Sequence, residues 1–368
     1  MLDIKIVNGT SVHNTPIEIG IKDQKIVEVA ASIEKAATEI IDAKGQYVSY
    51  GWIDAHVHCY EKMSLYYDYP DEIGIKKGVT TIIDAGSSGE SNIKEFYELA
   101  KNAKTNVRAL MNISKFGIVE QDELADLSKI NEEINVERIN ELPDFIVGIK
   151  ARMSKTVVGG NGIRPLEMAK ELQTRFEHLP LMVHIGSAPP ELSEILSHLE
   201  AGDVVTHCYN GKPNGIIDTN GEIKPFVWEA YKKGIVFDIG HGTDSFNFNV
   251  AKEAVSKGLL CQTISTDLYH RNRENGPVYD LATTLEKLLS VGFSLEEVIE
   301  KVTINPAKIF HFETKGELKP GMDADITIFT LNEEAKEVVD SNDNHVTVNH
   351  TIHPTMCLVA GNSYKIGE

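Results

Sequence analysis

The chain has 368 residues and a formal net charge of −19 at pH 7, from 36 Lys and Arg against 55 Asp and Glu. Its 42% hydrophobic and 25% charged residues are ordinary globular values, which exclude extended disorder, a collagen-like fibre and a disulfide scaffold. Phosphate backbones and anionic membranes repel so acidic a chain, so we expect neither nucleic acid nor a membrane as a partner.

The first fifty residues predict a small β-sheet. Residues 2–8, 17–21 and 25–29 alternate like short strands, and turn signals such as Asn8-Gly9 separate them. Similar strands return near the other end of the chain at 326–329, 346–348 and 356–359. We therefore predict a discontinuous β-sandwich domain that both termini form, from residues 1–50 and 312–368.

Between these ends, in residues 51–311, short apolar runs that end in polar residues alternate with stretches of helical spacing. The helical stretches include 93–103, 165–176, 191–199 and 281–289. Eight strand-and-helix units match a (β/α)8 TIM barrel, whereas no G-x-G-x-x-G opens a helix, which disfavours the alternative of a doubly wound open sheet. The eight predicted strands are 48–58, 79–85, 107–113, 145–150, 181–185, 204–207, 235–239 and 261–267.

Targeting signals and cysteine pairs are missing from the sequence. The first six residues read as a strand rather than a signal peptide, and no run of about 18 apolar residues occurs. The four cysteines form no C-x-x-C pair, which is typical of reduced thiols. We expect a soluble, cytoplasmic protein with free cysteines at positions 59, 208, 261 and 357.

The first chemical motif is Gly51-Trp-Ile-Asp-Ala-His-Val-His58. Residues two apart share a face of a strand, so His56 and His58 point the same way, which in a barrel is inward toward the active-site mouth. Two neutral imidazoles on one face are preferred ligands of Zn²⁺. The alternative is a pair of hydrogen-bonded surface histidines.

Four further strands end in residues that bind metals or carry protons: Lys150, His184, His207 and Asp267. One strand-end histidine is more often structural than a ligand, but four such ends after a His-x-His pair are hard to obtain by chance. We expect four imidazoles, a carboxylate and an amine around one barrel mouth.

Lys150 needs a separate explanation, because an ammonium group among metal-binding histidines repels cations and is costly to bury. As a neutral amine it can react with CO₂ to form a carbamate, an anionic oxygen donor that can bridge two metal ions. The alternative is a lysine paired with an acid such as Asp267.

With these motifs, the chain resembles the amidohydrolase superfamily of binuclear metal hydrolases over nearly its whole length. Residues 303–307 (TINPA) and 316–325 (GELKPGMDAD) also resemble the family's return segment into the sandwich. The resemblance implies two divalent metal ions, expected to be Zn²⁺. It assigns His56, His58 and Asp267 to the more buried ion, His184 and His207 to the exposed one, and N6-carboxylated Lys150 to both.

The resemblance also implies a mechanism. A hydroxide between the two metal ions attacks a carbonyl that the exposed ion polarises. Asp267 is the expected catalytic residue, because it accepts the hydroxide proton and passes it to the leaving nitrogen or oxygen.

Substrate-binding residues are expected on the loops after the strands. Arg152 lies two residues past Lys150 and could hold a substrate carboxylate in bidentate fashion, or form a salt bridge that orders its loop. Residues 154–162 are glycine-rich enough for a lid or a mobile surface loop. The other candidates are His241, Tyr209 and Asn210.

The strings GIKAR, THCYNG and DIGHG resemble, within the superfamily, a deacetylase group whose members are often labelled dihydroorotases. This resemblance implies removal of an acyl group, expected to be acetyl, from a small N- or O-acylated acid. Alternatives are a cyclic amide hydrolase of dihydroorotase or hydantoinase type and an adenine deaminase, although adenine deaminases generally lack the strand-four lysine. Non-enzymatic scaffold relatives have lost metal ligands, whereas all six are present here. Barrel enzymes of this type often assemble as homo-oligomers.

Overall fold

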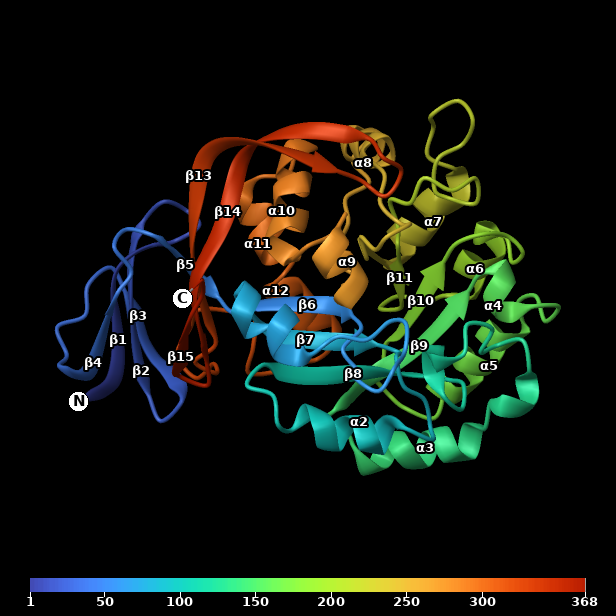
Figure 1. The fold of residues 1–368 in the computed structure, drawn as a ribbon, viewed down its shortest axis with the longest axis horizontal. Helices are drawn as coiled ribbons and strands as arrows, with labels where there is room; N and C mark the ends of the chain where they lie inside the picture. Colours follow the sequence, from blue (N-terminus) through green and yellow to red (C-terminus); the bar gives the residue numbers. More distant parts are fainter. Residues whose placement is uncertain (368) are drawn as a thin grey trace.

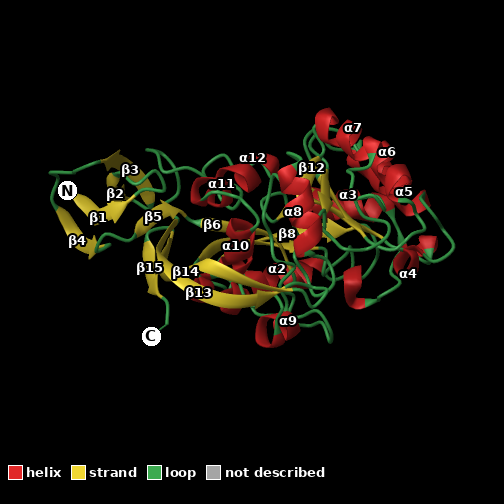
Figure 2. Ribbon diagram, turned by 90° about the horizontal axis from the view of Figure 1, so that it is seen from above, coloured by secondary structure: helices red, strands yellow, loops and turns green. Residues whose placement is uncertain are grey.

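The computed structural model describes residues 1–367 and has a mixed α/β fold with two sheets (Figures 1 and 2). The larger part of the chain forms a curled sheet of seven parallel strands, in which each strand pairs with its neighbours in chain order. Its core is apolar on both faces, as expected for a parallel sheet that helices cover. The strands are β6 (Trp52–Val57), β7 (Val79–Ala85), β8 (Asn106–Asn112), β9 (Ile146–Met153), β10 (Leu181–Ile185), β11 (Val204–Thr206) and β12 (Val236–Asp238).

The predicted eighth strand at 261–267 is not a regular strand. It makes two isolated parallel bridges, Asp238 with Thr263 and Val57 with Leu268, so it contacts both edge strands of the sheet. The backbone N–H of Asp267 donates to the carbonyl of His56 at 2.6 Å. The segment therefore closes the curled sheet into a barrel, but its irregular backbone keeps it from forming a continuous ladder.

Helices follow most of the strands and cover the outside of the curled sheet (Figure 1). All four predicted helical stretches are present, with ends that differ by a few residues. Residues 154–162, for which a lid and a mobile surface loop were the two alternatives, include a helix whose Val157 and Val158 are buried, which neither alternative predicts. The helices are α1 (Pro70–Ile73), α2 (Ile93–Ala100), α3 (Glu132–Glu141), α4 (Lys155–Val158), α5 (Arg164–Gln173), α6 (Leu192–His198), α7 (Pro225–Lys233), α8 (Phe248–Ser256), α9 (His270–Asn275), α10 (Leu281–Ser290), α11 (Leu295–Glu300) and α12 (Ile304–Ile309).

Both ends of the chain meet in the second sheet, which has eight strands. Strand β13 pairs antiparallel with β5, with Ile326 opposite Tyr50, and a separate hydrophobic cluster fills this part of the molecule. The sandwich architecture and the domain boundaries stay predictions. The strands are β1 (Leu2–Thr10), β2 (Pro16–Lys22), β3 (Lys25–Ala30), β4 (Ala37–Asp42), β5 (Tyr47–Tyr50), β13 (Ile326–Val339), β14 (His345–Val359) and β15 (Asn362–Lys365).

Two predicted strand boundaries are wrong. The run predicted at 48–58 is divided at Gly51 into β5, which belongs to the second sheet, and β6, which belongs to the barrel. At Gly51 the chain passes so close to Thr80 that a Cβ would lie 2.2 Å from its Oγ1. The pieces predicted at 346–348 and 356–359 are parts of one 15-residue strand, β14.

The long β13–β14 hairpin leaves the second sheet and crosses over α10 toward α8 (Figure 1). Its buried Val338, Val348 and Ile352 join the hydrophobic core of the barrel. The two halves of the fold are therefore joined by this hairpin as well as by the chain at Gly51.

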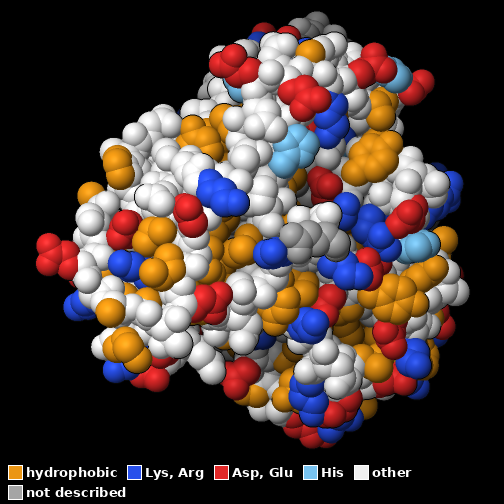
Figure 3. All heavy atoms as spheres, turned by 60° about the vertical axis from the view of Figure 1, so that its left-hand side comes forward, with side chains coloured by type: hydrophobic (Ala, Val, Ile, Leu, Met, Phe, Trp, Pro, Cys, Tyr) orange, Lys and Arg blue, Asp and Glu red, His pale blue; other side chains and the backbone are white. Residues whose placement is uncertain are grey.

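The surface drawn in Figure 3 carries acidic and basic side chains interspersed with scattered apolar ones. No helix within residues 1–367 is both long and apolar enough to cross a membrane.

Candidate metal centre

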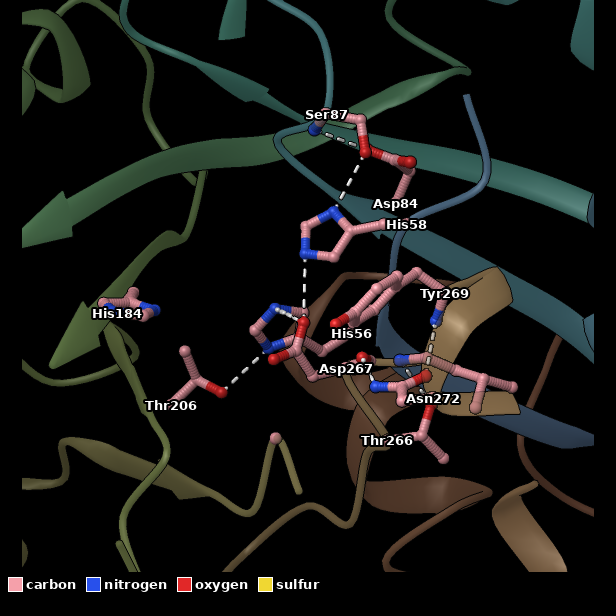
Figure 4. A network of polar contacts seen from close by, with 12 residues as sticks. His56, His58, Asp84, Ser87, His184, Thr206, Thr266, Asp267, Tyr269 and Asn272 are labelled. Carbon is pink, nitrogen blue, oxygen red and sulfur yellow. Dashed lines mark hydrogen bonds and ion pairs between the residues drawn. The ribbon is translucent and has the colours of Figure 1, made fainter. Parts of the chain in front are cut away.

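The six predicted ligand residues lie together at the C-terminal ends of the barrel strands. The closest pairs join His184 Nδ1 to His207 Nε2 at 2.8 Å, and His58 Nε2 to Asp267 Oδ1 at 3.0 Å. His56 Nε2 lies 3.4 Å from the same carboxylate oxygen. Figure 4 shows the rings of His56 and His58 directed at the carboxylate of Asp267. A cavity of about 50 Å³ lies here, lined by His56, His58, Tyr66, Ile118, Lys150, Arg152, His184 and Asp267.

The ligand residues come from elements far apart in the sequence. His56 lies on β6 and His58 directly follows it, while Val57 between them belongs to the apolar core. Lys150 lies on β9 with its Nζ 3.3 Å from His56 Nε2. The others are His184 on β10, His207 just after β11 and Asp267 in the closing segment.

Hydrogen bonds fix the tautomer of two of the histidines. The hydroxyl of Thr206 donates to Asp238 Oδ2 at 2.7 Å, so its oxygen accepts from His56 Nδ1 at 2.9 Å. His207 Nδ1 lies 2.6 Å from the carbonyl oxygen of Gly240, which only accepts, so this nitrogen donates. In both rings Nε2 is left with its lone pair toward the cluster, as in metal-ligating histidines.

His58 is oriented in a similar way through Ser87. Its Nδ1 lies 2.9 Å from Ser87 Oγ (Figure 4). The carboxylate of Asp84 accepts from the backbone N–H groups of Ser87 and Cys59, both at 2.8 Å. Asp84 therefore anchors the loop that supports His58.

The backbone at two ligand positions is left-handed. His207 has φ 70° and Asp267 has φ 52°, values that non-glycine residues adopt rarely. Two glycines of the DIGHG string lie against these residues. A Cβ on Gly242 would lie 2.5 Å from Asp267 Oδ2, and one on Gly240 would lie 2.9 Å from His207 Nδ1. Only glycine allows this close approach.

The electrostatics favour the neutral form of His56, His184 and His207. Burial, with further repulsion from Lys150, lowers the pKa of His56 well below its ordinary value. Burial and the neighbouring His207 do the same to the pKa of His184, and burial lowers the pKa of His207 itself to about 4. Neutral imidazoles are the form that binds metal ions.

The pKa values of Lys150 and Asp267 are both lowered. The lower pKa favours the neutral form of the lysine and the charged form of the aspartate. Burial lowers the pKa of Lys150 to about 7, although the nearby Asp267 opposes the shift. Burial also opposes ionisation of Asp267, but the hydrogen bond from His58 and the electrostatic influence of the neighbouring His207 and Lys150 lower its pKa below the usual value. An accessible neutral amine, an ionised carboxylate and neutral imidazoles together fit divalent metal ions with nitrogen and oxygen ligands.

Arg152 lines the cavity and also forms the salt bridge that was the alternative prediction. Its Nε and Nη2 donate to the two carboxylate oxygens of Glu123 at 2.7 and 2.6 Å, and Glu123 is only 1% exposed. Within residues 1–367, Nη1 of Arg152 has no hydrogen-bond partner.

The structure does not bring the other three substrate-binding candidates to the cavity, because buried hydrogen bonds occupy their side chains. The Tyr209 hydroxyl donates to the carbonyl of Leu259 at 2.7 Å. The Asn210 amide turns back to the carbonyl of His207 at 2.8 Å. His241 is fully buried and accepts at Nε2 from Lys287 Nζ at 2.8 Å. These residues support the centre rather than line it.

Sequence reasoning missed Tyr66, Ile118 and Glu123, which lie in irregular segments without a motif. It also missed the supporting pair of Thr206 and Asp238. Both lie at strand ends beside residues that were singled out, so the strand-end pattern could have identified them.

Comparison with known proteins gives the family. A family profile described as a deacetylase-like composite domain matches residues 318–365. A curated protein of Enterococcus faecalis (strain ATCC 700802 / V583), named deacetylase, is 60% identical over 98% of this chain and 99% of its own length. A solved structure described as an adenine deaminase has a TM-score of 0.98 and 59% identity, covering 99% of this chain and 100% of that one.

A second solved structure, described as a dihydroorotase, has a TM-score of 0.90 and 34% identity, covering 99% of this chain and 97% of that one. These proteins share the whole fold with this chain, which confirms the resemblance drawn from the strand-end motifs. The chain is a hydrolase and belongs to the deacetylases of the amidohydrolase superfamily.

Proposed function

We propose that this enzyme removes an acyl group, expected to be acetyl, from a small N- or O-acylated acid. The observation that carries the proposal is that three imidazoles, Asp267 and Lys150 line one cavity, with a fourth imidazole, that of His207, 2.8 Å from His184. The name of the 60%-identical relative supports the acyl class.

The donor set fits two divalent metal ions, for which we propose Zn²⁺. Bound there, the ions would lower the pKa of water and polarise the substrate carbonyl. In this proposal His56, His58 and Asp267 would hold one ion, His184 and His207 would hold the other, and Lys150 would supply an anionic oxygen ligand if it is carboxylated.

Asp267 is the proposed proton carrier. Water adds its oxygen to the acyl carbon and gives its proton to the Asp267 carboxylate. Asp267 then passes this proton to the leaving nitrogen or oxygen as that bond to the acyl carbon breaks. The products are the acyl acid and the free amine or alcohol.

Arg152 is the proposed contact for the substrate's own carboxylate. Its guanidinium is held in place by Glu123, and Nη1 is free to donate a charge-assisted hydrogen bond. The tested variant is the pair Arg152→Gln with Glu123→Gln, because removing Arg152 alone would leave a buried carboxylate unpaired. For an acetylated acid KM is expected to rise about 10- to 100-fold, whereas KM for its methyl ester is expected to stay within about twofold.

The test of the function is a substrate panel of N-acetyl amino acids, acetylated hydroxy acids, dihydroorotate, hydantoins and adenine. We expect acetate release from at least one acetylated acid. Turnover should be lost in Asp267→Asn and should stay at the wild-type level in the exposed control Asp122→Asn. No acetate release, together with hydrolysis of dihydroorotate or a hydantoin, would contradict the proposal.

A second candidate is adenine deamination, because the solved structure at 59% identity carries that description. Ammonia release from adenine faster than acetate release from every acetylated acid would favour it.

We further propose a cytoplasmic location, since the four cysteines are free and buried.

A further inference from the structure

The tip of the β13–β14 hairpin, residues 340–344, lies against the β12–α8 loop, residues 239–247. The Ser341 backbone N–H donates to the carbonyl of Phe246 at 3.0 Å, and the Phe246 N–H donates back to Ser341 Oγ at 3.2 Å. The Ser341 hydroxyl in turn donates to the carbonyl of Gly242 at 3.0 Å. One hydroxyl group therefore connects two points of the loop that are four residues apart.

The side chain of Asp340 holds the hairpin tip in the conformation that allows these contacts. Asp340 is 3% exposed, and its Oδ1 accepts from the backbone N–H groups of Asn342 and Asn344 at 2.7 and 2.9 Å. Its Oδ2 accepts from the N–H of Phe248, the first residue of α8, at 2.8 Å. Asp340 thus fixes the turn and attaches it to the barrel at once.

The arms of the hairpin are anchored by a buried carboxylate of α10. Glu286 is 1% exposed, and it accepts from the backbone N–H of Ile352 on β14 at 2.9 Å and from Lys336 Nζ on β13 at 2.8 Å. Both strands are therefore held where they cross the barrel, so the tip cannot shift freely.

On its other side the β12–α8 loop reaches the proposed proton carrier. The Gly242 N–H donates to the carbonyl of Thr266 at 2.9 Å, and the Gly242 backbone lies so close to Asp267 Oδ2 that a Cβ would be 2.5 Å from it. Lys287, which lies on α10, donates from its Nζ to His241 Nε2 at 2.8 Å. The loop is held between the hairpin tip and α10, with its backbone against the carboxylate.

We propose that Ser341 is a positioning residue, through which the C-terminal hairpin holds Gly242 against Asp267 and fixes the orientation of that carboxylate. The inference rests on the proposed role of Asp267 in proton transfer. A proton carrier must point at both the attacking and the leaving atom, and a displacement of about 1 Å can lower the rate about 100-fold. The hairpin is thereby part of the catalytic apparatus although it begins in the second sheet.

The test compares Ser341→Ala with the conservative Ser341→Thr and with Ser363→Ala, an exposed control on β15. In Ser341→Ala we expect kcat to fall about 10- to 100-fold, while KM stays within about twofold and metal content is unchanged. Ser341→Thr keeps the hydroxyl and is expected to restore most of kcat. A fall in metal content and kcat together, without recovery in Ser341→Thr, would show a merely structural role and overturn the inference.

Amide hydrogen exchange gives a readout that does not depend on the substrate. We expect faster exchange in residues 239–248 of Ser341→Ala and unchanged exchange in β6. Unchanged exchange at 239–248 would overturn the inference whichever reaction the enzyme catalyses, and faster exchange with unchanged kcat would remove its link to Asp267. A wild-type enzyme that releases no acetate contradicts the proposed function alone.

Discussion

Thr206→Val is expected to weaken metal binding although Thr206 is not a ligand. Its hydroxyl accepts from His56 Nδ1 at 2.9 Å and donates to Asp238 Oδ2 at 2.7 Å. Valine has nearly the same shape but neither function, so the change removes this bridge with little effect on packing.

The magnitude follows from what each partner retains. Asp238 keeps the hydrogen bonds from the Ser265 and Thr263 hydroxyls, both at 2.6 Å. His56 loses the only acceptor of its Nδ1–H within residues 1–367, in a site where it is 1% exposed. Losing such a partner behind a ligand histidine typically costs about 10- to 100-fold in metal affinity, or about 1.4–2.7 kcal/mol.

The assay is a zinc competition titration against a chelator of known affinity, with protein zinc content measured in parallel. Thr206→Ser keeps the hydroxyl and is expected to bind zinc like the wild type. Thr303→Val is the matched control, because within residues 1–367 its buried hydroxyl bonds only to the carbonyl of Ile299, at 2.6 Å, and Thr303 does not line the cavity. Wild-type zinc affinity in Thr206→Val would refute the reasoning about the His56 tautomer.

Three more predictions follow from the same geometry. Asp267→Asn is expected to lower kcat about 100- to 10,000-fold while most of the metal stays bound, and near-normal kcat at full metal content would contradict its role. Lys150→Ala is expected to lose metal and activity. Added propionate should restore part of the metal content and part of the activity, because a free carboxylate fits the space of the missing carbamate. If propionate restores neither, the result would weigh against carboxylation of Lys150. Burial lowers the pKa of Lys287 to about 7, so the unfolded chain binds more protons between pH 7 and about 10.5. Lys287 should therefore make the unfolding free energy rise with pH in that window, by at most about 1.4 kcal/mol per pH unit, and Lys287→Met should make the rise less steep in denaturant titrations.

The strand-end pattern predicts the metal ligands because a parallel barrel brings every strand end to one mouth. His56, His184 and Asp267 are far apart in the sequence, yet the topology alone places them together. Polar residues that follow the same strands are less predictable. Tyr209 and His241 satisfy buried backbone and lysine groups, and a single sequence does not distinguish this role from substrate contact.

The β13–β14 hairpin was not predictable from periodicity. Residues 332–337 are mostly polar and mostly exposed, so they resemble a loop between two short strands. Their extended conformation depends on cross-strand pairing and on contact with α10, which are tertiary effects. The predicted eighth strand differs for another reason. Its apolar run is present, but only Thr263 and Leu268 make isolated bridges, and the backbone of Asp267 between them is left-handed.

The pairing of β5 with β13 has a consequence for synthesis on the ribosome. Tyr50 pairs with Ile326, so the edge of β5 that faces β13 has no partner while the intervening residues are made. At about 5–20 residues per second, this interval lasts roughly 14–55 s. During that time an unpaired strand edge is exposed next to a growing barrel, which is the condition that favours association between nascent chains. Because β13 and β14 follow the barrel strands in the sequence, the hairpin tip that contacts Gly242 is translated after them. If Ser341 has the proposed positioning role, a nascent chain reaches full activity only after this hairpin has been made.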